Sequence, residues 1–172
     1  MKKILHLFLL ITISTICYGQ SYNRINSSTL IKLIESSKLP SYILFYIPNC
    51  PVANKQTLKF CENYIKYSDK INYIIIAITN KDELIEKSIL GNSIKLPIYV
   101  LENKNANNLE NNYKLFTSEF CKYYKISDYN FSSLLIGNNK IYYKSLMNNV
   151  SLKKTKKLLK KIKWLSYSSI VV

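Results

Sequence analysis

Two short and almost uninterrupted apolar runs constrain the fold of this chain more than any other feature of its sequence. They are Ser41–Ile47 (SYILFYI) and Ile71–Thr79 (INYIIIAIT). A strand with apolar residues at nearly every position is suited to burial on both faces, as in parallel sheets. The segment between the runs starts with Pro51, which fits the first turn of a helix because its missing N–H costs nothing there. We therefore predict a strand, a helix that runs to about Tyr67, and a second strand.

The rest of the chain continues this alternation of helices and strands. Before the first apolar run, a helix is predicted over Thr29–Ser37, capped by Asn26-Ser27-Ser28. After the second run, we predict a helix from Asn80 or Lys81 to about Leu90, a strand over Lys95–Leu101 and an asparagine-rich loop over Asn103–Asn112. The chain then continues with a helix over Thr117–Tyr124, strands over Ser132–Ile136 and Ile141–Lys144 joined by a GNNK turn, and a helix over Ser151–Leu165. Strands that alternate with helices and end in a hairpin imply an α/β fold, with a mixed sheet and helices on both faces.

The N-terminus has the layout of a secretory signal. Two lysines precede an apolar stretch of 14 residues, Ile4–Cys17, and small residues follow at the positions that signal cleavage requires. The apolar stretch is short for a membrane span. We expect residues 1–19 to be a signal peptide cleaved near Gly19. Residues 20–172 are expected to form a single exported domain, in the periplasm or outside the cell.

The residue types that the chain lacks exclude several kinds of chemistry. The one histidine, His6, falls in the signal, so the mature chain would have no Ser-His-Asp or Cys-His catalysis and no histidine metal site. Gly91 and Gly137 are too few for a glycine-rich phosphate loop. Lysine supplies nearly all of the net charge of +15 in a composition poor in glycine and arginine, so we expect no nucleic acid partner. No cofactor or metal ion is predicted, and thiol chemistry is the main enzymatic option left.

Cys50 has the strongest physical case for such chemistry. It stands between Asn49, where the first apolar run has ended, and Pro51, where the predicted helix begins. A thiol at the start of a helix faces free N–H groups and the positive end of the helix dipole, which favour the thiolate. A thiolate can attack a disulfide or react with peroxide to give a sulfenic acid. The alternative is an inherited cysteine in a fold that has lost its chemistry, and the sequence leaves both interpretations open.

The other two cysteines of the predicted mature chain are expected to be buried. Cys61 lies eleven residues after Cys50, which places the two about 16 Å apart along one helix, too far for a disulfide. It shares a predicted apolar face with Leu58 and Ile65 and is expected in the core. Cys121 falls in the helix over Thr117–Tyr124. It is either packed inside, as such cysteines usually are, or resolves Cys50 when the local structure opens.

Several segments resemble the thioredoxin-fold superfamily, in particular exported redoxin-like proteins related to the peroxiredoxin and thiol–disulfide groups. FYIPNCPVAN (Phe45–Asn54) is similar to their active-site segment, and the resemblance extends over residues 28–165. The segments that carry it are INYIIIAIT for the following strand, KLPIYVLEN for the inserted strand of the larger redoxins, KYYKI (Lys122–Ile126) for the helix end before the substrate-side loop, and SSLLIGNNKIYYKS for the closing hairpin. The resemblance implies a thioredoxin-like fold with a mixed central sheet flanked by helices, an inserted strand–helix unit, and a C-terminal hairpin plus helix.

The chain departs from the patterns of the two best-known activities of that superfamily. Ala53 stands where the second cysteine of a CxxC pair would be. Ile43 and Ile47 stand where peroxiredoxins have proline and threonine, and Arg24 is the only arginine that could serve as their distal arginine. These departures argue against a dithiol thioredoxin and against a standard peroxiredoxin.

A third departure concerns the proline that these proteins carry in cis opposite the active cysteine, just before the hairpin strand. In NFSSLLI that position falls on Phe131, or on Asn130. Pro97 would hold it instead if Lys95–Leu101 were the hairpin strand, but the spacing from Cys50 favours the first register. The predicted surroundings of the Cys50 thiol are therefore Asn49, Pro51, Ala53, Asn130 and Phe131.

The residues and the resemblance together predict a thiol–disulfide oxidoreductase-like protein in which Cys50 exchanges with protein thiols or disulfides. The second thiol would come from another molecule or from Cys121, the candidate resolving residue. The alternative is a redox-inactive thioredoxin-fold module that binds a partner at the cell envelope. The lysine-rich helix over Ser151–Leu165 either contacts an anionic envelope surface or is simply the solvated face of the last helix, and we favour the second interpretation.

Overall fold

The computed structural model describes residues 22–88, 96–102, 108–127, 131–146 and 152–168, with side chains in the last helix described as far as residue 161. The predicted signal peptide, residues 1–19, lies outside these residues. The strands are β1 (Asn23–Ile25), β2 (Ser41–Tyr46), β3 (Asn72–Ala77), β4 (Ile98–Leu101), β5 (Ser133–Gly137) and β6 (Lys140–Ser145). The helices are α2 (Ser27–Glu35), α3 (Pro51–Tyr67), α4 (Glu83–Lys87), α5 (Leu109–Tyr124) and α6 (Leu152–Ser168).

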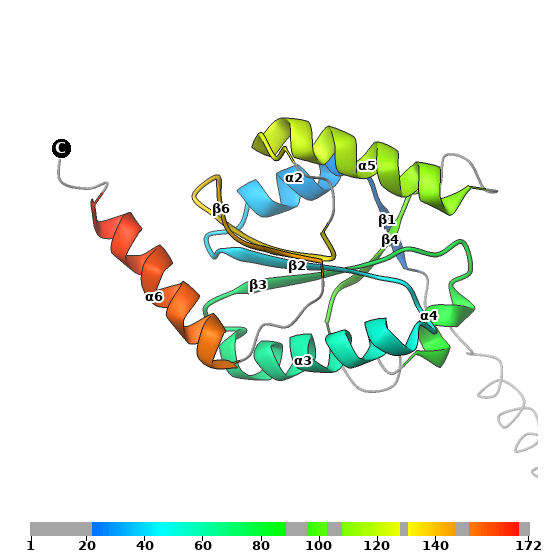
Figure 1. Ribbon diagram of the computed structural model, residues 1–172, viewed down its shortest axis with the longest axis horizontal. Helices are drawn as coiled ribbons and strands as arrows, with labels where there is room; N and C mark the ends of the chain where they lie inside the picture. The colour runs from blue at the N-terminus through cyan, green and yellow to red at the C-terminus, as the bar shows by residue number, and fades with distance from the viewer. Residues whose placement is uncertain (1–21, 89–95, 103–107, 128–130, 147–151, 169–172) are drawn as a thin grey trace, which may run out of the picture.

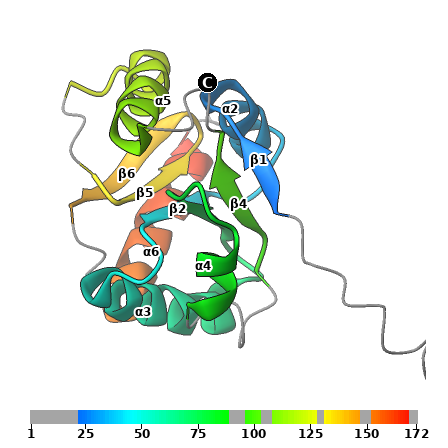
Figure 2. The same ribbon diagram turned by 90° about the vertical axis from the view of Figure 1, so that its right-hand side faces the viewer.

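A six-stranded mixed sheet with the strand order β1-β4-β3-β2-β5-β6 forms the centre of the molecule (Figures 1 and 2). The first four strands in this order are parallel, β5 runs antiparallel to β2, and β6 completes an antiparallel hairpin with β5. Helices α2 and α5 contribute to the core on one face of the sheet, and α3, α4 and α6 to the core on the other. The predicted α/β architecture, a mixed sheet between two layers of helices with a hairpin and a helix at its C-terminal end, is confirmed.

The two apolar runs form the central strands β2 and β3, whose residues are almost all buried. All six residues of β2 are buried, and their side chains alternate between the two cores, with Tyr42 and Leu44 on the α3 side and Ile43 and Phe45 on the α5 side. On the α3 side, the ring of Phe60 packs on Tyr42 with the centroids 4.8 Å apart. Burial on both faces is what the apolar runs predicted, and it makes β2 a rigid base for the segment that follows it.

Local signals predicted several element boundaries correctly. Helix α3 spans Pro51–Tyr67, as expected from the proline that begins it. Asn26 caps α2, and its side chain accepts a hydrogen bond of 2.9 Å from the Thr29 N–H. In the hairpin turn, Asn138 and Asn139 have φ angles of 48° and 55°. Asparagine tolerates this left-handed region better than most residues, which explains why GNNK marks the turn.

The prediction is wrong at the edge of the sheet that β1 forms. The strand β1 is absent from the prediction because its sequence, NRI, has only one apolar residue, the buried Ile25. Its place is set by parallel pairing with β4, in which Asn23 lies opposite Tyr99, and no local pattern reveals such pairing. Helix α4 ends at Lys87 rather than near Leu90, and residues 89–95, which include the predicted start of the third strand, lie outside the described residues.

The buried face of α3 also differs from the predicted one. Leu58 is 44% exposed and Ile65 is 78% exposed, whereas Cys61 is only 4% exposed. The residues that face the sheet are Phe60 and Tyr67, which are 0% and 8% exposed. Leu58 and Ile65 are seven residues apart, and so are Phe60 and Tyr67, so each pair lies along one side of the helix. We call the first pair the aliphatic line and the second the aromatic line. The aromatic line packs on the sheet, which leaves the aliphatic line in solvent and Cys61 at the border of the buried face.

Helix α5 begins two turns earlier than predicted, at Leu109 instead of Thr117. The asparagine-rich sequence before Tyr113 reads as a loop, but Asn108 caps the helix by accepting a hydrogen bond of 3.0 Å from the Asn111 N–H. The prediction of a loop over Asn103–Asn112 is therefore wrong from Leu109 onward, and residues 103–107 lie outside the described residues. The added turns extend α5 toward the end of the sheet where Cys50 lies.

Helix α6 is docked on α3 by polar contacts as well as apolar ones. The buried Thr155 hydroxyl donates a hydrogen bond of 2.5 Å to the side-chain carbonyl of Asn63, and Leu159 is buried in the core. The lysines of its described part are all exposed, namely Lys153, Lys154, Lys156, Lys157, Lys160 and Lys161. This is the arrangement of a solvated outer helix face, and binding of an anionic surface stays a prediction. None of the described helices is long and apolar enough to span a membrane.

Candidate thiol site at the start of α3

Cys50 lies where the buried strand β2 turns into helix α3. Its N–H donates a hydrogen bond of 3.3 Å to the carbonyl of Ile47, and its own carbonyl accepts one of 2.9 Å from Asn54. Asn49 has a φ of 65°, a left-handed conformation that asparagine adopts at low cost. Cys50 is the N-cap residue and Pro51 the first residue of the helix. The sequence Asn-Cys-Pro therefore makes a tight turn that presents the cysteine at the helix start, as predicted.

The Cys50 side chain lines a cavity of about 490 Å³ at this end of the molecule. Its walls come from the end of β2, the first turn of α3, the first turns of α5, and Ser132 just before β5. Cys50 itself is half-buried. Ile47 and Val52, which also line the cavity, are 56% and 53% exposed, so its entrance is apolar. The cavity can hold a side chain or small group of another molecule against the thiol.

Phe131, which the preferred register places before the hairpin strand, lies two residues before β5, since the strand begins at Ser133. β5 is the strand that pairs antiparallel with β2, whereas Pro97 precedes β4, which is parallel to β3 and not adjacent to β2. Pro97 is therefore not in the position opposite Cys50, and Asn130 lies outside the described residues. Phe131 is only 3% exposed and packs on the ring of Phe45 at 5.8 Å. Its side chain belongs to the core and does not line the cavity of Cys50.

The other two described cysteines lie on opposite faces of the sheet. Cys61 belongs to the core on the α3 side, as expected, and burial, followed by the nearby Glu62 carboxylate, raises the pKa of its thiol to about 12. Cys121 is fully buried in the core on the α5 side. It lies twelve residues after Leu109 on α5, about 18 Å along the helix axis from the end that lines the Cys50 cavity. No disulfide joins the three described cysteines, and resolution of Cys50 by Cys121 stays a prediction.

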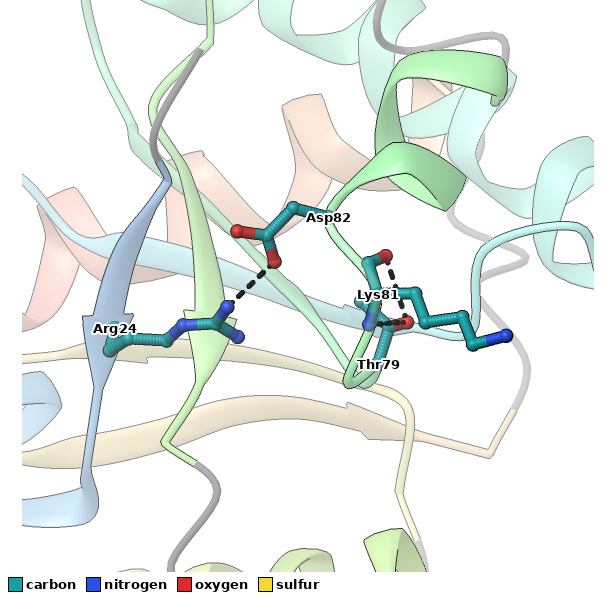
Figure 3. A network of polar contacts seen from close by, with 4 residues as sticks. All are labelled: Arg24, Thr79, Lys81 and Asp82. Carbon is teal, nitrogen blue, oxygen red and sulfur yellow. Dashed lines mark hydrogen bonds and ion pairs between the residues drawn. The ribbon is translucent and has the colours of Figure 1, made fainter. Parts of the chain in front are cut away.

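Arg24 is engaged at the far edge of the sheet and not at Cys50. Its guanidinium lies 2.8 Å from the Asp82 carboxylate, an ion pair that joins β1 to the start of α4 (Figure 3). Beside it, the Thr79 hydroxyl accepts a hydrogen bond of 3.0 Å from the Lys81 N–H. β1 is three positions from β2 in the strand order, which corresponds to about 14 Å across the sheet. The described residues therefore bring no arginine to Cys50, in keeping with the departure from the peroxiredoxin pattern.

The cavity contains residues that the sequence analysis did not single out. Leu109, Glu110 and Tyr113 line it from α5, and Ser132 lines it from the segment before β5. All four are distant from Cys50 in the sequence, and the three on α5 were expected in or next to a loop. The signal that could have located them is the cap at Asn108, together with the spacing of Glu110 and Lys114, which form an i,i+4 ion pair of 2.6 Å.

Comparisons with known proteins give matches only at the level of structure. No protein-family model matches the chain, and no curated protein is significantly similar to it. The thioredoxin domain of a thiol-disulfide oxidoreductase from Bacteroides vulgatus matches with a TM-score of 0.49 and 15% identity, over 72% of this chain and 79% of its own. StoA from Bacillus subtilis matches with a TM-score of 0.49 and 18% identity, over 73% and 85%. A putative thiol:disulfide interchange protein DsbE from Chlorobium tepidum matches with a TM-score of 0.49 and 11% identity, over 75% and 82%.

Proposed function

We propose that this chain of thioredoxin-like fold exchanges disulfides through a single thiol, Cys50. The observation that carries the proposal is the difference in access among the described cysteines. Cys50 is half-buried and opens into a cavity of about 490 Å³, whereas Cys61 and Cys121 are 4% and 0% exposed. Disulfide exchange requires a sulfur that another molecule can approach in line, and only Cys50 meets this requirement among the described residues.

The position of Cys50 supports its use as the attacking sulfur. The first N–H groups of a helix have no partner within the helix. Because Pro51 has no N–H, the first N–H groups of this helix of 17 residues are those of Val52 and Ala53, and the Cys50 side chain makes no hydrogen bond that caps them. Attack needs the thiolate, and the positive end of a helix dipole lies at this end of α3.

The exchange proceeds without an external oxidant or reductant. The Cys50 thiolate attacks one sulfur of a disulfide R–S–S–R′, a new bond forms between Cys50 Sγ and that sulfur, and R′–S⁻ leaves with the electron pair of the broken bond. Cys50 is oxidised to a mixed disulfide, and one sulfur of the substrate is reduced. A second thiolate then attacks the mixed disulfide and releases Cys50.

The second thiolate should come from another molecule. Ala53 stands three residues after Cys50, where a dithiol protein has its resolving cysteine, and it packs against the core on the α3 side. Cys121 could serve only after part of the core opens, since it is fully buried. A single accessible thiol makes the mixed disulfide long-lived, because no neighbouring thiol competes for it. The partners we propose are therefore protein thiols and disulfides.

We further propose that the protein acts outside the cytoplasm. The support is the signal-like layout of residues 1–19, with an apolar stretch after two lysines. The intact mass of the protein recovered from cells that express the full chain tests this. We expect a chain that begins near Gln20, and a mature chain that retains Met1 would contradict export by signal cleavage.

The proposed function is tested by the kinetics of exchange with a peptide disulfide. The mature chain and its Cys50→Ala, Cys61→Ala and Cys121→Ala variants are mixed with a peptide linked by a disulfide to a chromophoric thiol, and release of the thiol is followed. We expect release with the wild type and with Cys61→Ala, and none with Cys50→Ala. Equal release from Cys50→Ala and the wild type would refute the proposal and favour the redox-inactive binding module. The Cys121→Ala variant separates the two sources of the resolving thiol, because it slows the second step only if Cys121 takes part.

A further inference from the structure

The segment that faces Cys50 is held in place without a proline. Phe131 lies two residues before β5, and Ser132, the residue between them, lines the cavity of Cys50. A proline would fix the backbone here by its ring. In this chain the backbone angles have to be fixed by contacts instead, because Phe131 and Ser132 have no such restriction.

Tyr113, in helix α5, provides one of these contacts. Its hydroxyl donates a hydrogen bond of 2.8 Å to the backbone carbonyl of Phe131, and its ring packs on Phe45 with the centroids 5.8 Å apart. Tyr113 also lines the cavity of Cys50. It therefore contacts the cavity, the strand that leads to Cys50, and the segment that faces Cys50.

The hydroxyl of Tyr113 keeps its proton over the whole pH range in which thiol exchange is studied. Burial, followed by the nearby Cys121, raises the pKa of Tyr113 to about 12. The hydroxyl is therefore a permanent donor, and the Phe131 carbonyl is a permanent acceptor. The hydrogen bond is half-buried, so water competes with it less than it would at an exposed site.

Two backbone hydrogen bonds attach the same segment to the sheet, and the Ser132 hydroxyl also donates a hydrogen bond of 2.5 Å to the Leu146 carbonyl. The Phe45 N–H donates to the Ser132 carbonyl at 2.8 Å, and the Ser132 N–H donates to the Ser145 carbonyl at 2.8 Å. These bonds join Ser132 to the strands on either side of it. The Ser132 N–H and the Phe131 carbonyl belong to one planar peptide group, so this group is held from β6 through its N–H and from Tyr113 through its carbonyl. The contact from Tyr113 is what attaches this peptide group to α5.

We propose that Tyr113 is a positioning residue for disulfide exchange at Cys50, and that its hydrogen bond to Phe131 holds the wall against which a peptide substrate lies. The inference rests on the proposed function, since it names what orients the substrate at the same site. Tyr113 does not touch the reacting sulfur atoms in this role. It acts through the backbone of Phe131 and Ser132, so its effect is on peptide substrates that contact this wall and not on small disulfides that do not.

The test compares Tyr113→Phe with Tyr124→Phe in the mature chain. Tyr124 is a matched control because it lies on the same helix, and its buried hydroxyl has no hydrogen-bond partner among the described residues. Exchange of Cys50 is measured with a peptide disulfide and with a small aromatic disulfide. We expect Tyr113→Phe to slow exchange with the peptide by about threefold to tenfold, as for the loss of one hydrogen bond, with a higher KM. The small disulfide should react as with the wild type, and Tyr124→Phe should change neither rate.

A second measurement does not depend on thiol chemistry. Amide hydrogen exchange at Phe45 and Ser132 reports on the two bonds that flank the segment, and we expect faster exchange at both in Tyr113→Phe but not in Tyr124→Phe. Unchanged amide exchange in Tyr113→Phe would overturn the inference, and so would an equal loss of rate with both disulfides. Faster amide exchange in Tyr113→Phe, in a protein whose wild type exchanges no disulfide, would support the positioning contact while it refutes the proposed function.

Discussion

Cys50 lies at the start of α3 and Cys61 lies within it, but the two thiols differ in burial and in access from solvent. Cys50 is at the N-cap, half-buried, and next to a cavity with an apolar entrance. Cys61 lies three turns further on and is 4% exposed in the core, where burial raises the pKa of its thiol to about 12. One position makes a thiol available to another molecule, and the other makes it part of the packing. The comparison shows that the position of a cysteine relative to α3 decides how accessible its thiol is.

The largest expected effect is on the rate of alkylation. In the folded protein, iodoacetamide should modify Cys50 on the order of a thousandfold faster than Cys61, because a buried thiol reacts only when the structure opens locally or globally. Mass spectrometry of proteolytic peptides, taken at intervals, gives each rate. In denaturant the two should react alike, which is the control. Similar rates for the two cysteines in the folded state would contradict the comparison.

The two sides of α3 should differ strongly in their contribution to stability. Phe60→Ala is expected to lower the free energy of unfolding by about 3 to 5 kcal/mol, since it leaves a cavity between α3 and the sheet. Leu58→Ala on the exposed side should change it by about 0.5 kcal/mol or less. Urea unfolding followed by circular dichroism measures both. A large loss from Leu58→Ala would mean that the exposed line of α3 is covered by something in solution.

Removal of the hydrogen bond between α6 and α3 should have the next largest effect on the free energy of unfolding. Thr155→Val keeps the shape of the side chain but removes the donor to Asn63. We expect a loss of about 1 to 3 kcal/mol, because the side-chain carbonyl of Asn63 is left buried with one hydrogen bond fewer. Lys156→Ala, at the exposed position next to Thr155, is the control and should leave the free energy of unfolding almost unchanged. An unfolding free energy of Thr155→Val equal to that of wild type would show that this contact does not hold α6.

Over the range from pH 8 to pH 10, the smallest expected effect is the pH dependence that Cys61 causes. Burial raises its pKa from 9.0 to about 12, so as the pH rises past 9 the unfolded chain loses this proton while the folded chain keeps it. The unfolding free energy should therefore fall between pH 9 and pH 12, by up to about 1.4 kcal/mol per pH unit from this one group. Urea unfolding at pH 8, 9 and 10 should show a smaller decline in Cys61→Ala than in the wild type. An identical decline in both would contradict the burial of this thiol.

Much of the fold could be predicted because its signals are local. Pro51 begins α3, Asn138 and Asn139 form the hairpin turn, and the apolar runs form strands buried on both faces. β1 could not be predicted, because a polar strand of three residues is selected by its pairing with β4 rather than by its own pattern. The buried face of α3 could not be predicted either, because two lines of large apolar side chains run along this helix. Which of them packs on the sheet depends on the shape of the sheet.

The candidate site, too, could be predicted only in part from the sequence. The place of Cys50 follows from Asn49, Pro51 and the end of β2, all of which are neighbours in the sequence. The opposite wall depends on where α5 begins, and an asparagine-rich segment gives weak evidence for a helix. Tyr113 and Ser132 therefore line the same cavity as Cys50 only because of the fold. A hydrogen bond between a side chain of α5 and the backbone of Phe131 cannot be predicted from the pattern of residues.

The measurement that tests the central claim most directly is the identity of the sulfur that forms the mixed disulfide. The mature wild-type chain is mixed with a peptide disulfide and quenched with acid, and the adduct is located by mass spectrometry of proteolytic fragments. The single-thiol mechanism predicts the peptide on the fragment that contains Cys50, at close to one peptide per chain. An adduct on Cys61 or Cys121, or no adduct on a folded chain, would contradict it.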